Sequence, residues 1–133
     1  MSELNLLGED QVCPFCVMPT NRVTHQNDLA YAVQDGFPVT PFHSLVISMR
    51  HLPDYFSLTP DELIACNTLI HRIRDEICAK DKTVLGFNIG ANCGATAGQT
   101  IFHCHIHLIP RRQGDVEEPR GGTRHVIPGK GSY

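Results

Sequence analysis

The sequence lacks two features that would place the chain at a membrane or on a nucleic acid. No run of residues approaches the ~18 consecutive apolar residues of a membrane span, so we expect no membrane association. Basic residues are outnumbered, 11 against 14 acidic ones, for a formal net charge of −3. The composition therefore argues against a broad basic surface for duplex nucleic acid, but leaves room for a small anion in a local site.

A secretory signal is a third missing feature. Residues 1–7 hold neither a basic segment nor a long apolar stretch, so we expect no signal peptide and predict a cytoplasmic location. The six cysteines then indicate reduced thiols better than a disulfide framework.

The length and composition predict one domain over residues 1–133. The chain has no internal repeat or low-complexity segment, and 41% of its residues are hydrophobic, enough for an ordinary core. We expect this core within about 13–112. The polar segment 113–133, rich in Gly and Pro, is expected to form an arm over the surface or onto a partner chain.

The order of the expected elements predicts an α+β fold. Thr59 can cap a helix that begins at Pro60, and Glu62 completes a capping box. Apolar residues follow at spacings of three and four, as on one face of an amphipathic helix; these are Leu63, Cys66, Ile70, Ile73 and Ile77. Apolar stretches at 29–33, 44–47, 85–89 and 100–109 are expected to be strands. Strands grouped on either side of one long helix favour a mostly antiparallel sheet.

Three histidines alternate with apolar residues in the last of these stretches. His103, His105 and His107 occupy every second position, the spacing at which strand residues face the same side. The residues between them would face the other, buried side. Packing does not explain three imidazoles on one face, whereas metal binding, nucleophilic attack or proton transfer does.

A Cys-x-x-Cys pair near the start of the chain is a candidate metal site. Cys13 and Cys16 have the spacing that suits tetrahedral zinc, and His51 and His103 are candidates for the two remaining ligands. A thioredoxin-like redox pair has the same spacing, but the βαβ pattern expected around such a pair is missing. A catalytic zinc held by the three alternating histidines is the other alternative. It ranks lower because it leaves the cysteine pair without a role.

The stretch 98–109, Gly-Gln-Thr-Ile-Phe-His-Cys-His-Ile-His-Leu-Ile, resembles the motif of the histidine triad (HIT) family. The resemblance covers about 13–112. Gly-Gln-Thr before the triad and Leu-Ile-Pro-Arg after it resemble dinucleoside polyphosphate hydrolases of the fragile histidine triad type. The cysteine pair with His51 resembles the zinc-bearing HIT proteins and galactose-1-phosphate uridylyltransferase. One departure is Phe42, where the family usually has Gly.

The resemblance implies a covalent mechanism and a structural zinc. His105 would attack an α-phosphorus to give a nucleotidyl-histidine, which water then hydrolyses. His107 would hydrogen-bond the phosphate or the leaving oxygen. The implied zinc ligands are Cys13, Cys16, His51 and His103. HIT proteins are usually homodimers with a sheet continued across the interface, and the same is expected here.

The family's nucleotide contacts are implied at four further positions. Asp35 matches the residue that binds the ribose hydroxyls, although a simple turn aspartate is the alternative. Asn88, Gln99 and Thr100 match positions that contact phosphates or the leaving group. His43 either supports the triad or is a satisfied core histidine. The roles of Arg111 and Arg112 stay open.

Three functional interpretations remain from the sequence. The first is a dinucleoside polyphosphate hydrolase and the second a purine nucleoside phosphoramidase, which would share the nucleophile His105. The third is a nucleotide-binding or interaction protein with weak catalysis. The intact triad favours an enzyme.

Overall fold

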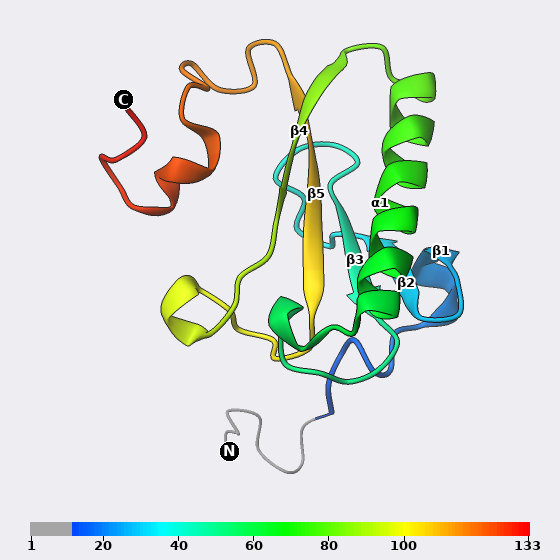
Figure 1. Ribbon diagram of the computed structural model, residues 1–133. Coiled ribbons are helices and arrows are strands. Elements are labelled where there is room, and N and C mark those ends of the chain that lie inside the picture. Colours follow the sequence, from blue (N-terminus) through cyan, green and yellow to red (C-terminus); the bar gives the residue numbers. More distant parts are fainter. Residues whose placement is uncertain (1–11) are drawn as a thin grey trace.

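The computed structural model describes residues 12–133, so the expectation about residues 1–7 concerns a segment outside the described residues. One long helix, α1 (Pro60–Lys80), lies against a five-stranded sheet of order β1-β2-β3-β5-β4, in which all neighbours are antiparallel (Figure 1). The strands are β1 (Val23–Gln26), β2 (Ala30–Gln34), β3 (Ser44–Ser48), β4 (Val84–Gly90) and β5 (His105–Arg112). The predicted α+β fold is confirmed. Within 12–133, no helix is both long and apolar enough to cross a membrane.

Helix α1 begins where the capping signal predicts. The Thr59 hydroxyl accepts a hydrogen bond from the Glu62 backbone N–H at 3.2 Å, and the Glu62 carboxylate accepts one from the Thr59 N–H at 2.9 Å. These two bonds satisfy backbone donors that an α-helix leaves free at its start. The Glu62 carboxylate also accepts two hydrogen bonds from Arg50, which ties the helix start to the segment that follows β3.

The two faces of the sheet are covered differently. Helix α1 covers one face, where its apolar stripe packs with Val46, Ile106 and Leu108. A second, smaller cluster on the other face joins Phe15 of the N-terminal segment to residues of β2 and β3. Figure 1 shows α1 and the C-terminal segment on opposite sides of the sheet. The first face is therefore the main core, and the second carries the smaller cluster.

Phe42, the departure from the family pattern, has a left-handed backbone with φ of 72°. Glycine adopts this conformation without the steric cost that a side chain imposes, of about 1–2 kcal/mol. Here the Phe42 ring packs against the main core, and the Lys80 ammonium lies 4.6 Å from its centroid. The ring therefore gains packing at a position whose backbone favours glycine.

The expected strand at 100–109 begins five residues late. Strand β5 starts at His105, and His103 lies in the irregular segment before it. There the Cys104 N–H donates to the Leu52 carbonyl, and the Ser48 N–H donates to the Cys104 carbonyl. These two isolated backbone hydrogen bonds stand where a regular β-ladder was expected. The alternation of histidines therefore predicted a strand that begins too early. Strand β1 was missed because Val-Thr-His-Gln is short and mostly polar.

Candidate functional site

His105 and His107 lie on β5, paired with Ile47 and Leu45 of β3 in the centre of the sheet. Both side chains point away from α1, since the intervening Ile106 belongs to the main core. They line a cavity of about 470 Å³, whose other walls come from the N-terminal segment and from the turn after β2. The rigid sheet thus presents two imidazoles to an open cavity.

The ring of His105 is held in one tautomer. Its Nδ1 lies 2.8 Å from the carbonyl oxygen of His103, and a carbonyl can only accept a hydrogen bond. Nδ1 therefore carries the proton when the ring is neutral, and Nε2 carries the lone pair. The Phe15 ring packs against His105 at 4.9 Å between centroids and restricts its rotation. His105 thus has an oriented, unprotonated nitrogen.

A chain of hydrogen bonds also fixes the tautomer of His107. The Val39 N–H donates to His43 Nδ1 at 3.0 Å, so His43 carries its proton on Nε2. That N–H donates to His107 Nδ1 at 2.9 Å, which leaves the His107 proton on Nε2. Asp35 Oδ2 lies 3.4 Å from His43 Nε2. His107 is therefore a neutral hydrogen-bond donor at its free nitrogen.

Burial favours the neutral imidazoles of His43 and His107. It lowers the pKa of His43 below the usual range, against the opposing effect of Asp35. It also lowers the pKa of His107, together with repulsion from His105 and His43. His43, which is 2% exposed, is thus part of the site as well as of the core.

The four predicted metal ligands come together at the end of the sheet. Cys13, Cys16, His51 and His103 each place a ligand atom within 4.8 Å of the other three. The Cys16 Sγ lies 3.1 Å from His51 Nδ1 and 3.5 Å from His103 Nδ1, and the Cys13 Sγ lies 3.4 Å from His103 Nδ1. Tetrahedral zinc with bonds of about 2.0–2.3 Å sets its ligand atoms about 3.3–3.8 Å apart. The cluster could therefore hold a metal ion of this size and geometry.

The hydrogen bond and the burial of His103 also suit a role as a metal ligand. Its Nε2 donates to the Ser48 carbonyl at 2.7 Å, which turns the unprotonated Nδ1 toward the cluster. The side chain is fully buried, and burial lowers its pKa, which favours the neutral, ligating form. Because His103 faces the cysteines and His51, the alternative of three triad histidines around one metal does not match the geometry.

The predicted nucleotide-binding residues are only partly brought together. Asp35 lines the cavity beside the histidines, and its second carboxylate oxygen accepts the Phe37 N–H, as in an Asx turn. Asn88 pairs with Ile109 in the sheet, on the same face as His107 but farther along β5, and its Oδ1 accepts from Arg111.

The other two predicted contacts lie in the loop before β5. Gln99 is buried, and its amide bonds the backbone of Pro53, Gly94 and Ile101. Thr100 is exposed. The roles of Gln99 and Thr100 toward phosphate stay predictions.

Sequence reasoning missed the role of Phe15. It lies between the two cysteines, is 8% exposed, and contacts the rings of both His103 and His105. Sequence spacing gave no signal for this contact, because it depends on folding residue 15 over residues 103 and 105. Phe15 thus joins the metal cluster to the cavity.

Comparison with known proteins identifies the relatives of this chain. The family model described as "HIT domain" matches residues 18–114. A bis(5'-nucleosyl)-tetraphosphatase (asymmetrical) of Schizosaccharomyces pombe is 35% identical over 98 residues, which cover 74% of this chain and 53% of that protein. An adenylylsulfatase of Arabidopsis thaliana, HINT3, is 35% identical over 91 residues, covering 68% and 46%. The chain therefore matches about half the length of these two relatives.

A solved structure shares the fold. The crystal structure of a Zn-bound histidine triad family protein from Mycobacterium smegmatis has a TM-score of 0.70 and 30% sequence identity, covering 77% of each chain. That protein binds zinc, and the cluster described above offers four zinc-type ligands.

Proposed function

The chain belongs to the HIT domain family, whose members are nucleotide-binding proteins and hydrolases, and we propose that it hydrolyses dinucleoside polyphosphates. His105 is the proposed nucleophile and His107 the group that stabilises the leaving oxygen. The tetraphosphatase relative supports this substrate class. Another relative is named as an adenylylsulfatase, a different activity, so the reaction is argued from the site itself.

The pair of fixed tautomers carries the proposal. His105 offers a lone pair at Nε2, whereas His107 offers an N–H at Nε2. A displacement at phosphorus needs one nucleophile and one donor for the oxygen that gains charge. Both stand on one strand face and line one cavity.

The first step forms a covalent intermediate. Nε2 of His105 attacks the α-phosphorus, a nitrogen–phosphorus bond forms, and the phosphoanhydride oxygen leaves with the bonding electrons. The leaving group is a nucleoside polyphosphate, which departs as an anion and needs a hydrogen bond more than a proton. Neutral His107 supplies that hydrogen bond through Nε2–H.

The second step restores the enzyme. Water attacks the same phosphorus, the nitrogen–phosphorus bond breaks, and nucleoside 5′-monophosphate leaves. The electron pair returns to Nε2 of His105, and the proton of the water passes to solvent. Asp35, at the cavity wall, is proposed to bind the ribose hydroxyls.

The same geometry favours anhydride over phosphoramide substrates. A departing amine must gain a proton, so His107 would have to become cationic or lose its own proton. His43 meets the inner nitrogen of His107 with an N–H, which opposes a second proton there. The phosphoramidase therefore ranks second.

The metal cluster has a structural role in this proposal. Cys13, Cys16, His51 and His103 would hold zinc, which cross-links the N-terminal segment to the ends of the central strands. The fold of this cysteine-bearing segment also places the Phe15 ring against the ring of His105.

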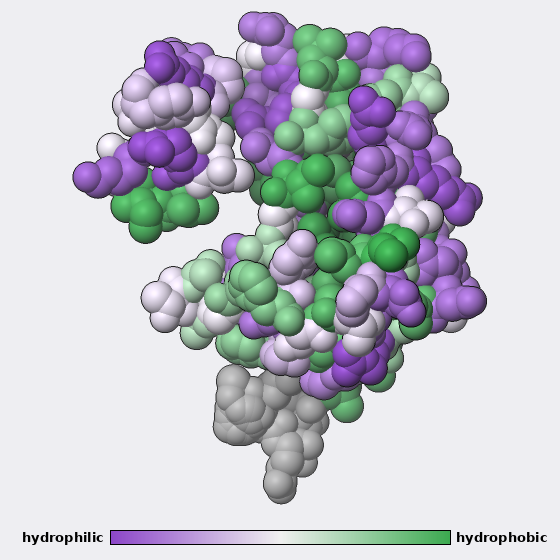
Figure 2. Space-filling view, viewed as in Figure 1, coloured by the Kyte–Doolittle hydropathy of each residue, from purple (hydrophilic) through white to green (hydrophobic). Residues whose placement is uncertain are grey.

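Strand β4 is the proposed dimer edge. It ends the sheet, and its Leu85 and Ile89 side chains are 74% and 55% exposed. Figure 2 shows hydrophobic residues along the middle of this face. We propose a homodimer whose sheet continues across β4, within a cytoplasm that keeps the six unpaired cysteines reduced.

Product analysis tests the function. Purified protein is offered diadenosine tetraphosphate and adenosine 5′-phosphoramidate separately, with His105→Ala as control. Preferential cleavage of the dinucleotide, lost in the variant, supports the hydrolase. Preferential release of ammonia identifies the phosphoramidase instead, and tight nucleotide binding without turnover identifies a binding protein.

A further inference from the structure

A second cavity, of about 580 Å³, lies between the C-terminal arm (residues 113–133) and the histidine face of the sheet. Figure 2 shows the arm standing away from the body of the molecule. We propose that this arm cavity receives the leaving nucleoside of a dinucleoside polyphosphate, so that the two nucleosides occupy two separate cavities. The inference rests on the proposed function and names the part of the substrate that each cavity takes.

The arm cavity begins two residues beyond His107 along β5. Ile109 follows His107 by two residues on the same face of β5 and lines the arm cavity, whereas His105 and His107 line the first cavity. Val39 lines the arm cavity too, and its backbone N–H holds His43. A phosphate chain that runs from His107 along β5 would therefore extend from the first cavity toward the arm cavity.

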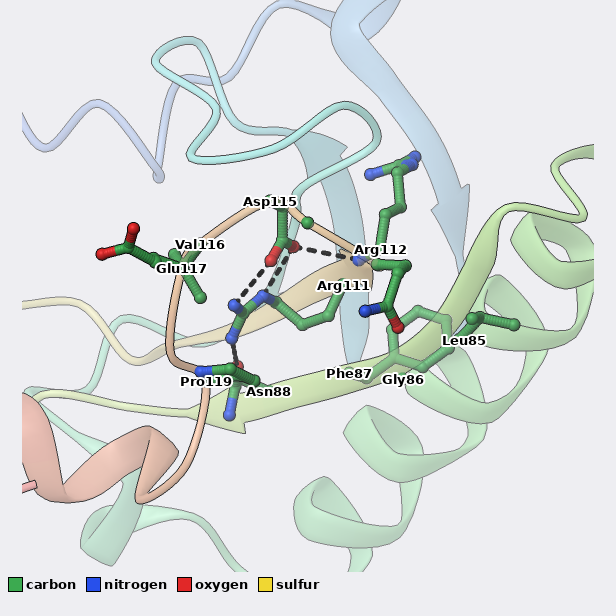
Figure 3. Close-up of a pocket in the computed structure, with 12 residues that line it drawn as sticks. Leu85, Gly86, Phe87, Asn88, Arg111, Arg112, Asp115, Val116, Glu117 and Pro119 are labelled. Atoms are coloured by element: carbon green, nitrogen blue, oxygen red, sulfur yellow. Dashed lines mark hydrogen bonds and ion pairs between the residues drawn. The ribbon is translucent and has the colours of Figure 1, made fainter. Parts of the chain in front are cut away.

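The charges of the arm cavity favour an uncharged group over a polyphosphate. Its one arginine, Arg111, is held by Asp115 through two hydrogen bonds of 2.8 Å, which neutralise its charge (Figure 3). The Glu118 carboxylate also lines the cavity and adds negative charge. The remaining titratable residue of the lining, His125, has its Nε2 2.9 Å from the Arg120 carbonyl. Two carboxylates against one guanidinium repel a terminal phosphate, whereas a nucleoside carries no charge to be repelled.

The polar groups suit a nucleoside. Arg111 donates to Asn88 Oδ1 at 2.7 Å, so the Asn88 amide nitrogen turns away from the guanidinium (Figure 3). That nitrogen faces the arm, since a Cβ at Gly122 would lie 3.4 Å from it. It can donate to a base carbonyl or ring nitrogen, and the Glu118 carboxylate can accept from ribose hydroxyls. Val39, Ile109 and Val116 provide apolar walls for the base.

If the arm cavity binds the leaving nucleoside, the enzyme should prefer substrates that carry one. Substrates with a nucleoside on the leaving side should gain from it, whereas adenosine 5′-phosphoramidate, whose leaving group is ammonia, should not. A volume of about 580 Å³ falls in the range of small-molecule sites.

Filling the cavity from the arm tests the inference. Thr123 lines the cavity and is exposed, so Thr123→Trp narrows the cavity without disturbing the core. The matched control is Val126→Trp, on the same arm, 79% exposed and outside the residues that line the cavity. Val116→Trp is a second filling variant, in case the first misfolds.

The readout is the ratio of kcat/KM for diadenosine tetraphosphate to that for adenosine 5′-phosphoramidate, measured with the full chain. We expect Thr123→Trp to lower this ratio by about tenfold or more and Val126→Trp to leave it unchanged. An unchanged ratio in both filling variants overturns the arm cavity as a subsite, while wild-type cleavage of the dinucleotide keeps the proposed function. A wild-type protein that leaves the dinucleotide intact overturns both.

Discussion

His43 Nε2 lies 2.9 Å from His107 Nδ1, and His43 is the donor of this hydrogen bond. The direction follows from the Val39 N–H, which occupies the other nitrogen of His43. A backbone group on the loop between β2 and β3 thereby decides which nitrogen of His107 carries the proton that faces the cavity.

Removing His43 should slow the reaction more than it weakens binding. His43→Leu removes the donor to His107, and a lost hydrogen bond of about 1.4–2.7 kcal/mol corresponds to a decrease in kcat of roughly 10–100-fold. His43→Gln, whose amide nitrogen can take the place of Nε2, should recover part of this loss. Steady-state kinetics with diadenosine tetraphosphate measures kcat and KM of both variants. A drop in kcat equal in both variants would count against a role in orienting His107.

His105→Ala should abolish covalent turnover and spare the nucleotide cavity. We expect kcat to fall by about 10³-fold or more, because the nucleophile is lost, while AMP binding changes little. Rapid acid quench with radiolabelled substrate should trap a nucleotidyl-protein in the wild type and none in the variant. Residual turnover close to wild type would remove His105 as the nucleophile.

The metal cluster should bind about one zinc per chain, as a structural site does. Cys16→Ser should lose the metal and lower the midpoint of thermal unfolding, since metal binding adds to folding free energy. The intrinsic rate of the protein that remains folded should change much less. Cys78→Ser is a control with a cysteine outside the cluster. Full metal content in Cys16→Ser, by elemental analysis, would disprove the assignment.

The Arg50–Glu62 pair should make stability depend on pH. Its hydrogen bonds from Arg50 and from the Thr59 backbone lower the pKa of the buried Glu62 to about 2. The unfolded chain takes up this proton near its ordinary pKa of 4.5. The contribution to stability is therefore complete above pH 4.5 and is lost as pH falls toward 2.

Glu62→Gln should cost about 1–3 kcal/mol at pH 7, the cost of breaking hydrogen bonds to a charged group. The difference from wild type should shrink as the pH falls from 4.5 to 3. Urea unfolding at three pH values measures this. If the difference in free energy of unfolding between the variant and the wild type stays constant with pH, the charge of the Glu62 carboxylate does not contribute to stability.

Local signals in the sequence predicted the long helix and most of the strands, but not the contacts between distant segments. The capping box at Thr59 and the alternating histidines are patterns of neighbouring residues, and α1 and β5 follow from them. The zinc-type ligand set was named because residue type limits the candidates. The contact of Phe15 with His105 and the bond between Arg111 and Asn88 join residues 90 and 23 positions apart. Only the packed fold determines which such residues meet.

The position of Phe15 has a consequence for how the protein would respond to metal supply. Its two flanking cysteines belong to the metal cluster, while its ring packs on His105. A cation bound by the cluster and a nucleotide bound in the adjoining cavity would therefore be thermodynamically linked. Each ligand would raise the apparent affinity for the other by the same factor. Zinc depletion would then appear first as weaker nucleotide binding, before the main core beneath α1 unfolds.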